Sequence, residues 1–97
     1  MVEGAFGLIG GERPTRVRLL FDREAARYVE RRQWHPSQVI TKTDRGVEMT
    51  MQVSGTTELK TWILGWGDRV EVLEPASLRA QVAEEHARAA GRYLEPG

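Results

Sequence analysis

Cysteine is absent from this 97-residue chain, and so is asparagine. Without cysteine the chain can form no disulfide, no thiolate zinc site and no iron–sulfur cluster, and it offers no cysteine nucleophile. Lysine is scarce, because twelve of the 14 basic side chains are arginine. These absences exclude thiol chemistry and leave the guanidinium group, which binds carboxylate and phosphate bidentately, as the main positive group.

Long apolar segments are missing too. No run approaches the roughly 20 residues that a membrane-spanning helix needs, and the chain starts without the basic and apolar regions of a signal peptide. We therefore expect a cytoplasmic protein. Residues 1–47 carry nine bases and six acids, net +3, and residues 48–97 carry five bases and eight acids, net −3. The pI of about 6.7 contrasts with the value above ~9 that is typical of nucleic-acid-binding domains.

The length fits one domain preceded by a short arm. We expect residues 1–14 to be a linker or arm from an upstream domain and residues 15–97 to be the folded domain. The arm mixes turn-forming and apolar residues, which indicates that it packs on its own domain, joins an upstream domain or crosses to a second copy. These residues are Gly4, Gly7, Gly10, Gly11 and Pro14, with Phe6, Leu8 and Ile9 between them.

Hydrophobic periodicity predicts seven elements. Asp22 is a typical N-cap for the first helix, Pro36 forces the chain out of the helix, and Gly67 ends the second helix. The apolar stripe of the last helix is Leu78, Val82, His86, Ala89 or Ala90, and Tyr93. In order, the predicted elements are a strand at 15–21, a helix at 22–32, strands at 37–43 and 47–53 joined by a tight turn, a helix with its apolar face at 59–66, a strand at 70–73 and a helix at 76–94.

The order β-α-β-β-α-β predicts an α+β fold, the ferredoxin-like split βαβ sandwich, with an added C-terminal helix. Such a fold has a four-stranded antiparallel sheet with two helices on one face. The other face is expected to show Arg16, Arg18 and Glu48, with opposite charges on neighbouring strands. The added helix either covers this face or docks on a partner.

This fold hosts many functions, so each must be argued from its residues. Iron–sulfur proteins and heavy-metal carriers of this class need cysteine, and acylphosphatases need asparagine. RNA-recognition domains stack bases on aromatic side chains of a central strand. Here the outward residues of that strand are Glu48, Thr50 and Gln52, which offer no stacking platform.

Catalysis and metal binding each have one weak candidate. His35 lies two residues from Ser37 and could act as a general base, but the sequence places no acidic residue to orient it. The favoured alternative to a catalytic role is structural: His35 forms a hydrogen bond with the backbone, and Trp34 packs at the edge of the core. A metal site from His35 and His86 lacks a third ligand. We therefore expect no enzyme activity, no catalytic residues, no metal and no cofactor.

Trp62 and Trp66 share the apolar face of the second helix, so both fit the core. Trp66 lies between two glycines and could instead anchor a protein interface, as tryptophan commonly does. The candidate interface or ligand residues are Arg16, Arg18, Trp34, His35, Gln38 and Trp66.

Several short motifs, in this order and spacing, resemble the WCX domain, the C-terminal extension of bacterial WYL-domain transcriptional regulators. The resemblance covers about residues 15–94, and the arm at Phe6-Gly7-Leu8-Ile9 is similar to the segment that enters this domain. The motifs are Val17-Arg18-Leu19-Leu20-Phe21-Asp22, Ala25-Ala26 with Val29, Trp34-His35-Pro36-Ser37-Gln38, Glu58-Leu59, Trp62-Ile63-Leu64-Gly65-Trp66-Gly67, Val70-Glu71-Val72-Leu73-Glu74-Pro75 and Leu78-Arg79.

The resemblance implies a ferredoxin-like domain that helps a regulator to dimerise and to respond to its effector. It implies an N-terminal helix-turn-helix domain and a WYL domain as partners in the same parent protein, which would bind nucleic acid in place of this chain. Neither domain is in this sequence, so their site residues do not carry over. Two other hypotheses stay open: a domain binding a small molecule or single-stranded nucleic acid at a dimer groove, and a small dimeric-barrel enzyme using His35.

Overall fold

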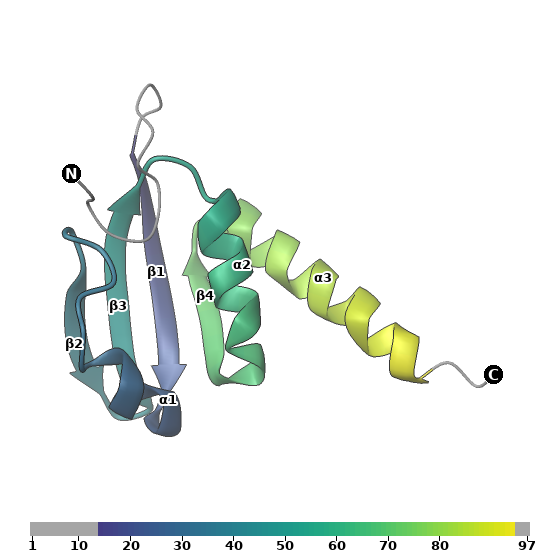
Figure 1. The fold of residues 1–97 in the computed structure, drawn as a ribbon, viewed down its shortest axis with the longest axis horizontal. Helices are drawn as coiled ribbons and strands as arrows, with labels where there is room; N and C mark the ends of the chain where they lie inside the picture. Colours follow the sequence, from purple (N-terminus) through teal and green to yellow (C-terminus); the bar gives the residue numbers. More distant parts are fainter. Residues whose placement is uncertain (1–13, 95–97) are drawn as a thin grey trace.

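Within residues 14–94, the fold consists of a four-stranded antiparallel sheet, three α-helices and a short 3₁₀-helix (Figure 1). A computed structural model describes residues 14–94. The sheet order is β2-β3-β1-β4, and the predicted α+β class is confirmed. The elements are β1 (Thr15–Asp22), α1 (Arg23–Val29), β2 (Val39–Thr43), β3 (Gly46–Val53), α2 (Thr57–Gly65), η1 (Gly67–Arg69), β4 (Val70–Glu74) and α3 (Ala76–Leu94).

One face of the sheet carries the core, and we call it the covered face. Every second side chain of β1 and β3 is buried, as the period of a strand requires. Helices α1 and α2, with the first turns of α3, supply the other side of the core (Figure 1). The buried side chains are Val17, Leu19, Phe21, Ala25, Ala26, Val29, Val47, Met49, Met51, Val53, Leu59, Ile63, Val72, Leu78 and Val82.

The β2–β3 hairpin closes at Gly46, and the backbone there requires glycine. Gly46 has φ +145°, which L side chains rarely adopt, and a Cβ on it would collide with the carbonyl oxygen of Phe21. Gly46 pairs with Thr43 on one side and with Asp22 on the other. The glycine therefore lets the hairpin and the end of β1 approach each other closely.

Helix α1 is shorter than predicted, because it ends at Val29 and not near residue 32. Asp22 caps its start as predicted, accepting a hydrogen bond from the amide of Ala25 at 2.8 Å. At the other end, the indole Nε1 of Trp34 donates to the carbonyl of Val29 at 3.1 Å. A side chain thus takes a carbonyl that the next helical turn would have used.

Strand β2 starts at Val39, two residues later than predicted. The hydroxyl of Ser37 accepts a hydrogen bond from the amide of Gln52 at 2.9 Å and lies 3.3 Å from the carbonyl of Gln52. The Ser37 side chain therefore stands where the backbone of β2 would otherwise pair with β3. Hydrophobic periodicity does not show that a side chain replaces a backbone group in this pairing.

Helix α2 ends as predicted, and η1 was not expected. Trp66 is the C-cap, and Gly67 follows with φ +65°, the left-handed conformation that commonly stops a helix. The chain then makes one 3₁₀ turn before β4.

Helix α3 starts against the domain and then leaves it. Leu78 and Val82 are its buried residues, and its packing partners are β4 and α2. Beyond them the helix projects from the sheet (Figure 1). It therefore does not cover the sheet face opposite α1 and α2, which was one of its two expected positions.

Candidate interaction surfaces

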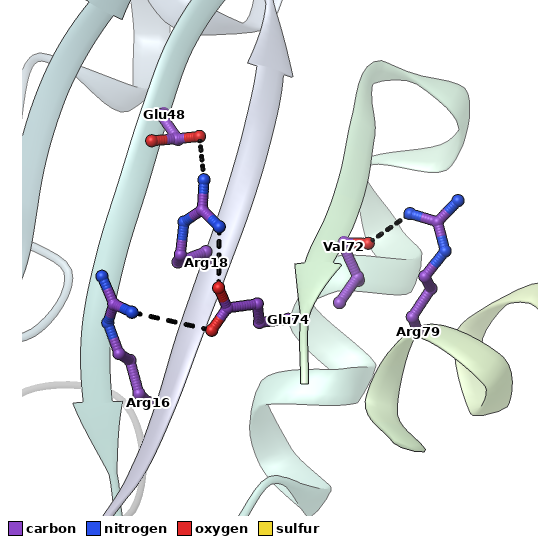
Figure 2. Close-up of polar contacts among 6 residues, drawn as sticks. All are labelled: Arg16, Arg18, Glu48, Val72, Glu74 and Arg79. Atoms are coloured by element: carbon purple, nitrogen blue, oxygen red, sulfur yellow. Dashed lines mark hydrogen bonds and ion pairs between the residues drawn. The ribbon is translucent and has the colours of Figure 1, made fainter. Parts of the chain in front are cut away.

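The sheet face opposite α1 and α2, the free face, carries a group of three ion pairs. Arg18 of β1 lies between Glu48 of β3 and Glu74 of β4, with its two terminal nitrogens 2.7 Å from an oxygen of each (Figure 2). Arg16 lies 3.7 Å from the other oxygen of Glu74. The Arg18 and Glu48 side chains are only 30% and 26% exposed. The predicted placement of Arg16, Arg18 and Glu48 on this face is confirmed.

These contacts shift two titrations on the free face. The hydrogen bond from Arg18, followed by the positive charges of Arg16 and Arg18, lowers the pKa of the Glu74 carboxyl. The hydrogen bonds to Glu74 and Glu48 raise the pKa of Arg18. Each arginine therefore already has an acidic partner within the chain. A phosphate ligand at this face would have to compete with Glu48 and Glu74.

The loop between α1 and β2 is organised by Gln38. Its Oε1 accepts hydrogen bonds from the amides of Trp34 at 2.6 Å and His35 at 3.3 Å, and its Nε2 donates to the carbonyl of Arg32 at 3.2 Å. One amide side chain thus satisfies three backbone groups that belong to neither helix nor strand. This explains why glutamine stands at the end of the Trp34–Gln38 motif.

His35 and Ser37 come together, as a catalytic pair would require. The Nδ1 of His35 accepts from the amide of Ser37 at 3.1 Å, so this nitrogen carries no proton, and the Ser37 hydroxyl lies 2.8 Å from it. Partial burial lowers the pKa of His35. Within residues 14–94 no carboxylate is bonded to the imidazole. The hydrogen bond from the Ser37 backbone agrees with the structural role favoured for His35.

Three tryptophans and one phenylalanine form a cluster on the covered face. Trp34 lies 5.0 Å from Trp62 and 6.5 Å from Trp66 between ring centroids, and Phe21 contacts Trp62 and Trp66 edge to face at 5.8 and 5.5 Å. The guanidinium of Arg32 sits 4.4 Å above the Trp34 ring. The predicted packing of Trp34 at the edge of the core is confirmed.

A groove borders this cluster where α1 passes the end of α2. Its volume is about 300 Å³, and Trp66 and Tyr28 line it. Across the groove, Arg69 and Glu24 form an ion pair at 2.6 Å. Trp66 therefore both packs against the core and shows one side to this groove.

The two histidines do not form a metal site in the part of the chain that the structure describes. No group of three or more histidine, aspartate or glutamate residues there could hold an ion. His86 lies on α3, where its buried Nε2 has no hydrogen-bond partner. Among the described helices, none is both long and apolar enough to span a bilayer.

The far end of α3 shows apolar side chains. Tyr93 is 87% exposed and Leu94 is 77% exposed. The predicted stripe of α3 is thus buried at Leu78 and Val82 and uncovered at Tyr93. On the polar side of the helix, Arg88 and Glu84 form an i,i+4 ion pair at 3.1 Å.

The six candidate residues occupy three places and make no single site. Arg16 and Arg18 share Glu74 on the free face, Trp34 and Trp66 meet on the covered face, and His35 and Gln38 lie in the loop before β2. Sequence reasoning did not single out Glu74 or Arg79 as contacts, and it associated Ser37 with His35 but not with Gln52. Alternation along β4 would place Glu74 on the side of Val72, and the register shift of β4 against β1 brings it to Arg18 on the free face instead. The contacts of Ser37 with Gln52 and of Arg79 with Val72 depend on the tertiary structure.

A comparison with family descriptions identifies residues 13–90 as a WCX domain. A search of curated proteins finds no match to this chain. The matched segment spans the sheet, α1, α2 and most of α3, which is well over half of the sequence. The chain therefore belongs to the WCX domain family.

Proposed function

We propose that this chain is a non-enzymatic regulatory and dimerisation module. It is the C-terminal domain of a bacterial, cytoplasmic transcription regulator that also carries a helix-turn-helix domain and a WYL domain. In this role it holds copies of the regulator together and relays effector binding to DNA binding. The parent protein, and not this chain, contacts the nucleic acid. Membership of the WCX family supports the assignment, and the strand order β2-β3-β1-β4 is compatible with a ferredoxin-like sandwich.

The observation that carries the proposal is the projecting half of α3. The helix runs for 19 residues, but its last buried residue is Val82. An exposed helical extension gains little from its own propensity, since most helical stability in proteins comes from packing. Tyr93 and Leu94 at its end would therefore gain most from a contact with another domain or another copy.

The test starts from the gene. Its coding sequence upstream of Met1 should encode a helix-turn-helix and a WYL domain, and a different upstream domain would contradict the proposal. The encoded WYL domain should then bind this chain in calorimetry. Replacing both Tyr93 and Leu94 by alanine should weaken this binding by about tenfold, as removal of one aromatic anchor does. Arg88→Ala, on the polar side of the same helix, is the matched control and should bind as the wild type does.

The groove beside Trp66 favours a second candidate, a ligand-sensing domain. Its volume of about 300 Å³ is at the lower end for small-molecule sites. A ligand there would contact the indole of Trp66, so titration with candidate metabolites or short single-stranded oligonucleotides should change the tryptophan fluorescence. Trp66→Phe should abolish this response. A response that survives this substitution would place the ligand elsewhere.

A further inference from the structure

The two edge strands of the sheet, β2 and β4, differ in what their outer sides offer. An edge strand presents every second backbone amide and carbonyl to its surroundings. The amide and carbonyl of Gln52 face β2, because both meet the Ser37 hydroxyl. Alternation along the ladder then makes Thr41 a residue that bonds β3. Ile40 and Lys42 consequently direct their backbone groups outwards.

The outer side of β4 is closed. The Nη1 of Arg79 donates to the carbonyl of Val72 at 2.8 Å (Figure 2). The same nitrogen forms an ion pair with Glu71 at 2.9 Å. The register of β4 against β1 also shifts between Arg18 and Leu19, which indicates a bulge. A bulge and a charged side chain are two common means of preventing an edge from pairing with another strand.

The outer side of β2 has neither protection. Across residues 14–94, no side chain bonds the outward backbone groups of Ile40 and Lys42. The strand has no proline and no register shift, and Lys42 is its one charged residue. Val39 at its start is 59% exposed. Of the two edges, β2 is therefore the one that can accept a further strand.

We propose that β2 pairs antiparallel with β2 of a second copy, around a two-fold axis at Thr41, to give a continuous eight-stranded sheet. This inference rests on the self-association in the proposed function and assigns it a surface. Ile40 of each copy exchanges backbone hydrogen bonds with Lys42 of the other. A contact of this kind is isologous, because the same surface serves on both copies.

The sequence of β2 is self-complementary in this register. Thr41 faces Thr41 of the second copy, and threonine pairs across strands are favourable. Val39 faces Thr43, so that no charged side chain opposes another of the same sign. Lys42, the single charge, falls opposite Ile40. A second copy therefore fits this edge without a change to any residue.

A charge-swap experiment tests the axis, because Thr41 alone faces itself. Thr41→Lys and Thr41→Glu should each weaken the dimer by about fivefold, since two like charges then oppose each other. Mixing the two variants should restore a dimer at least about tenfold tighter than either variant forms alone. Sedimentation measures the mass, and circular dichroism checks the fold. Thr41→Val, without charge, and Gln52→Lys, on the same face of β3, are matched controls that should dimerise as the wild type does.

Single-cysteine crosslinking gives an independent readout, because the chain has no cysteine of its own. Thr41→Cys should form an intermolecular disulfide on mild oxidation, as residues directly opposite each other lie within disulfide range. Gln52→Cys should not.

The outcomes separate this inference from the proposed function. A wild-type dimer that both Thr41 charge variants retain unchanged would overturn pairing through β2 and leave self-association standing. A wild-type chain that stays monomeric at all concentrations would overturn both. If Thr41→Lys and Thr41→Glu each weaken the dimer but mixing the two variants does not restore it, the two-fold axis does not lie at Thr41.

Discussion

The two faces of the sheet are formed by alternate residues of the same strands, but one face is apolar and buried and the other carries ion pairs. On the covered face, Leu19 and Phe21 are fully buried, and apolar burial supplies the free energy of folding. On the free face, Arg18, which directly precedes Leu19 in β1, is 30% exposed and forms ion pairs with two carboxylates. The difference teaches that stability is concentrated on one face, whereas the other is available for contacts.

The largest effect should follow a change on the covered face. Phe21→Ala removes a fully buried ring that contacts Trp62 and Trp66 and should cost about 3–5 kcal/mol of unfolding free energy. Urea unfolding followed by tryptophan fluorescence measures it. The control is Tyr28→Ala, at a side chain that is 58% exposed. Equal losses for the two variants would contradict the contrast.

A smaller effect is expected at the border of the covered face, in the loop before β2. Gln38→Ala leaves the amides of Trp34 and His35 and one carbonyl without their partner, and should cost about 1–3 kcal/mol. Gln33→Ala is the matched control, because Gln33 makes one hydrogen bond of 3.4 Å. If Gln38→Ala unfolds at the same denaturant concentration as this control, the loop is not organised by Gln38.

Changes on the free face should be smaller again and sensitive to salt. Replacing Arg18 by methionine removes two ion pairs that are partly exposed to solvent, and solvent screening keeps the contribution of such pairs small. We expect a loss well below that of Phe21→Ala, shrinking as the salt concentration rises. A loss as large as that of Phe21→Ala, independent of salt, would mean that the free face is a second core.

The free face also predicts a dependence on acid. The folded-state pKa of Glu74 is lowered, so the ionised carboxylate stabilises the fold above the unfolded-state pKa. This contribution is lost as the pH falls through the folded-state pKa. Glu74→Gln should therefore flatten the decline of stability below about pH 4.5, the ordinary range of the group. If the stability of Glu74→Gln declines with falling pH as that of the wild type does, the ion pairs of Glu74 do not cause the dependence on acid.

The smallest effect is expected at His35, whose folded-state pKa is also lowered, by burial. Because the pKa of His35 is higher in the unfolded chain than in the folded one, the unfolded chain binds the proton first as the pH falls. Stability from the neutral imidazole is then full above the ordinary pKa of 6.5 and falls as the pH drops from there toward the folded-state value. His35→Gln should remove this part of the decline, measured by thermal unfolding between pH 7.5 and pH 5, a window around that value. Unchanged pH dependence would show that His35 titrates alike in both states.

The sequence was sufficient for what depends on local pattern. The alternation Val17, Leu19 and Phe21 marked the covered face of β1, and the spacing of Leu59 and Ile63 marked the buried side of α2. Family resemblance and fold class followed from such patterns. The ion pair between Arg18 and Glu48 was also foreseeable, because it needs only the neighbouring strands.

What sequence reasoning missed depends on side chains that replace backbone groups. Ser37 occupies a place in the β3 ladder, Trp34 takes a carbonyl of α1, and Arg79 takes one of β4. Each contact joins segments whose relative position is set by the whole fold, so local hydrophobic periodicity does not predict it. The two ends that were predicted wrongly, those of α1 and β2, both lie at such replacements.

Self-association is the central claim, and the mass of the unmodified 97-residue chain in solution tests it most directly. Light scattering across a concentration series should show the mass rising from 11.0 kDa toward twice that value. A mass that remains at 11.0 kDa up to the highest concentration would contradict the account. In that case, these surfaces would serve for contacts with other domains of the parent protein.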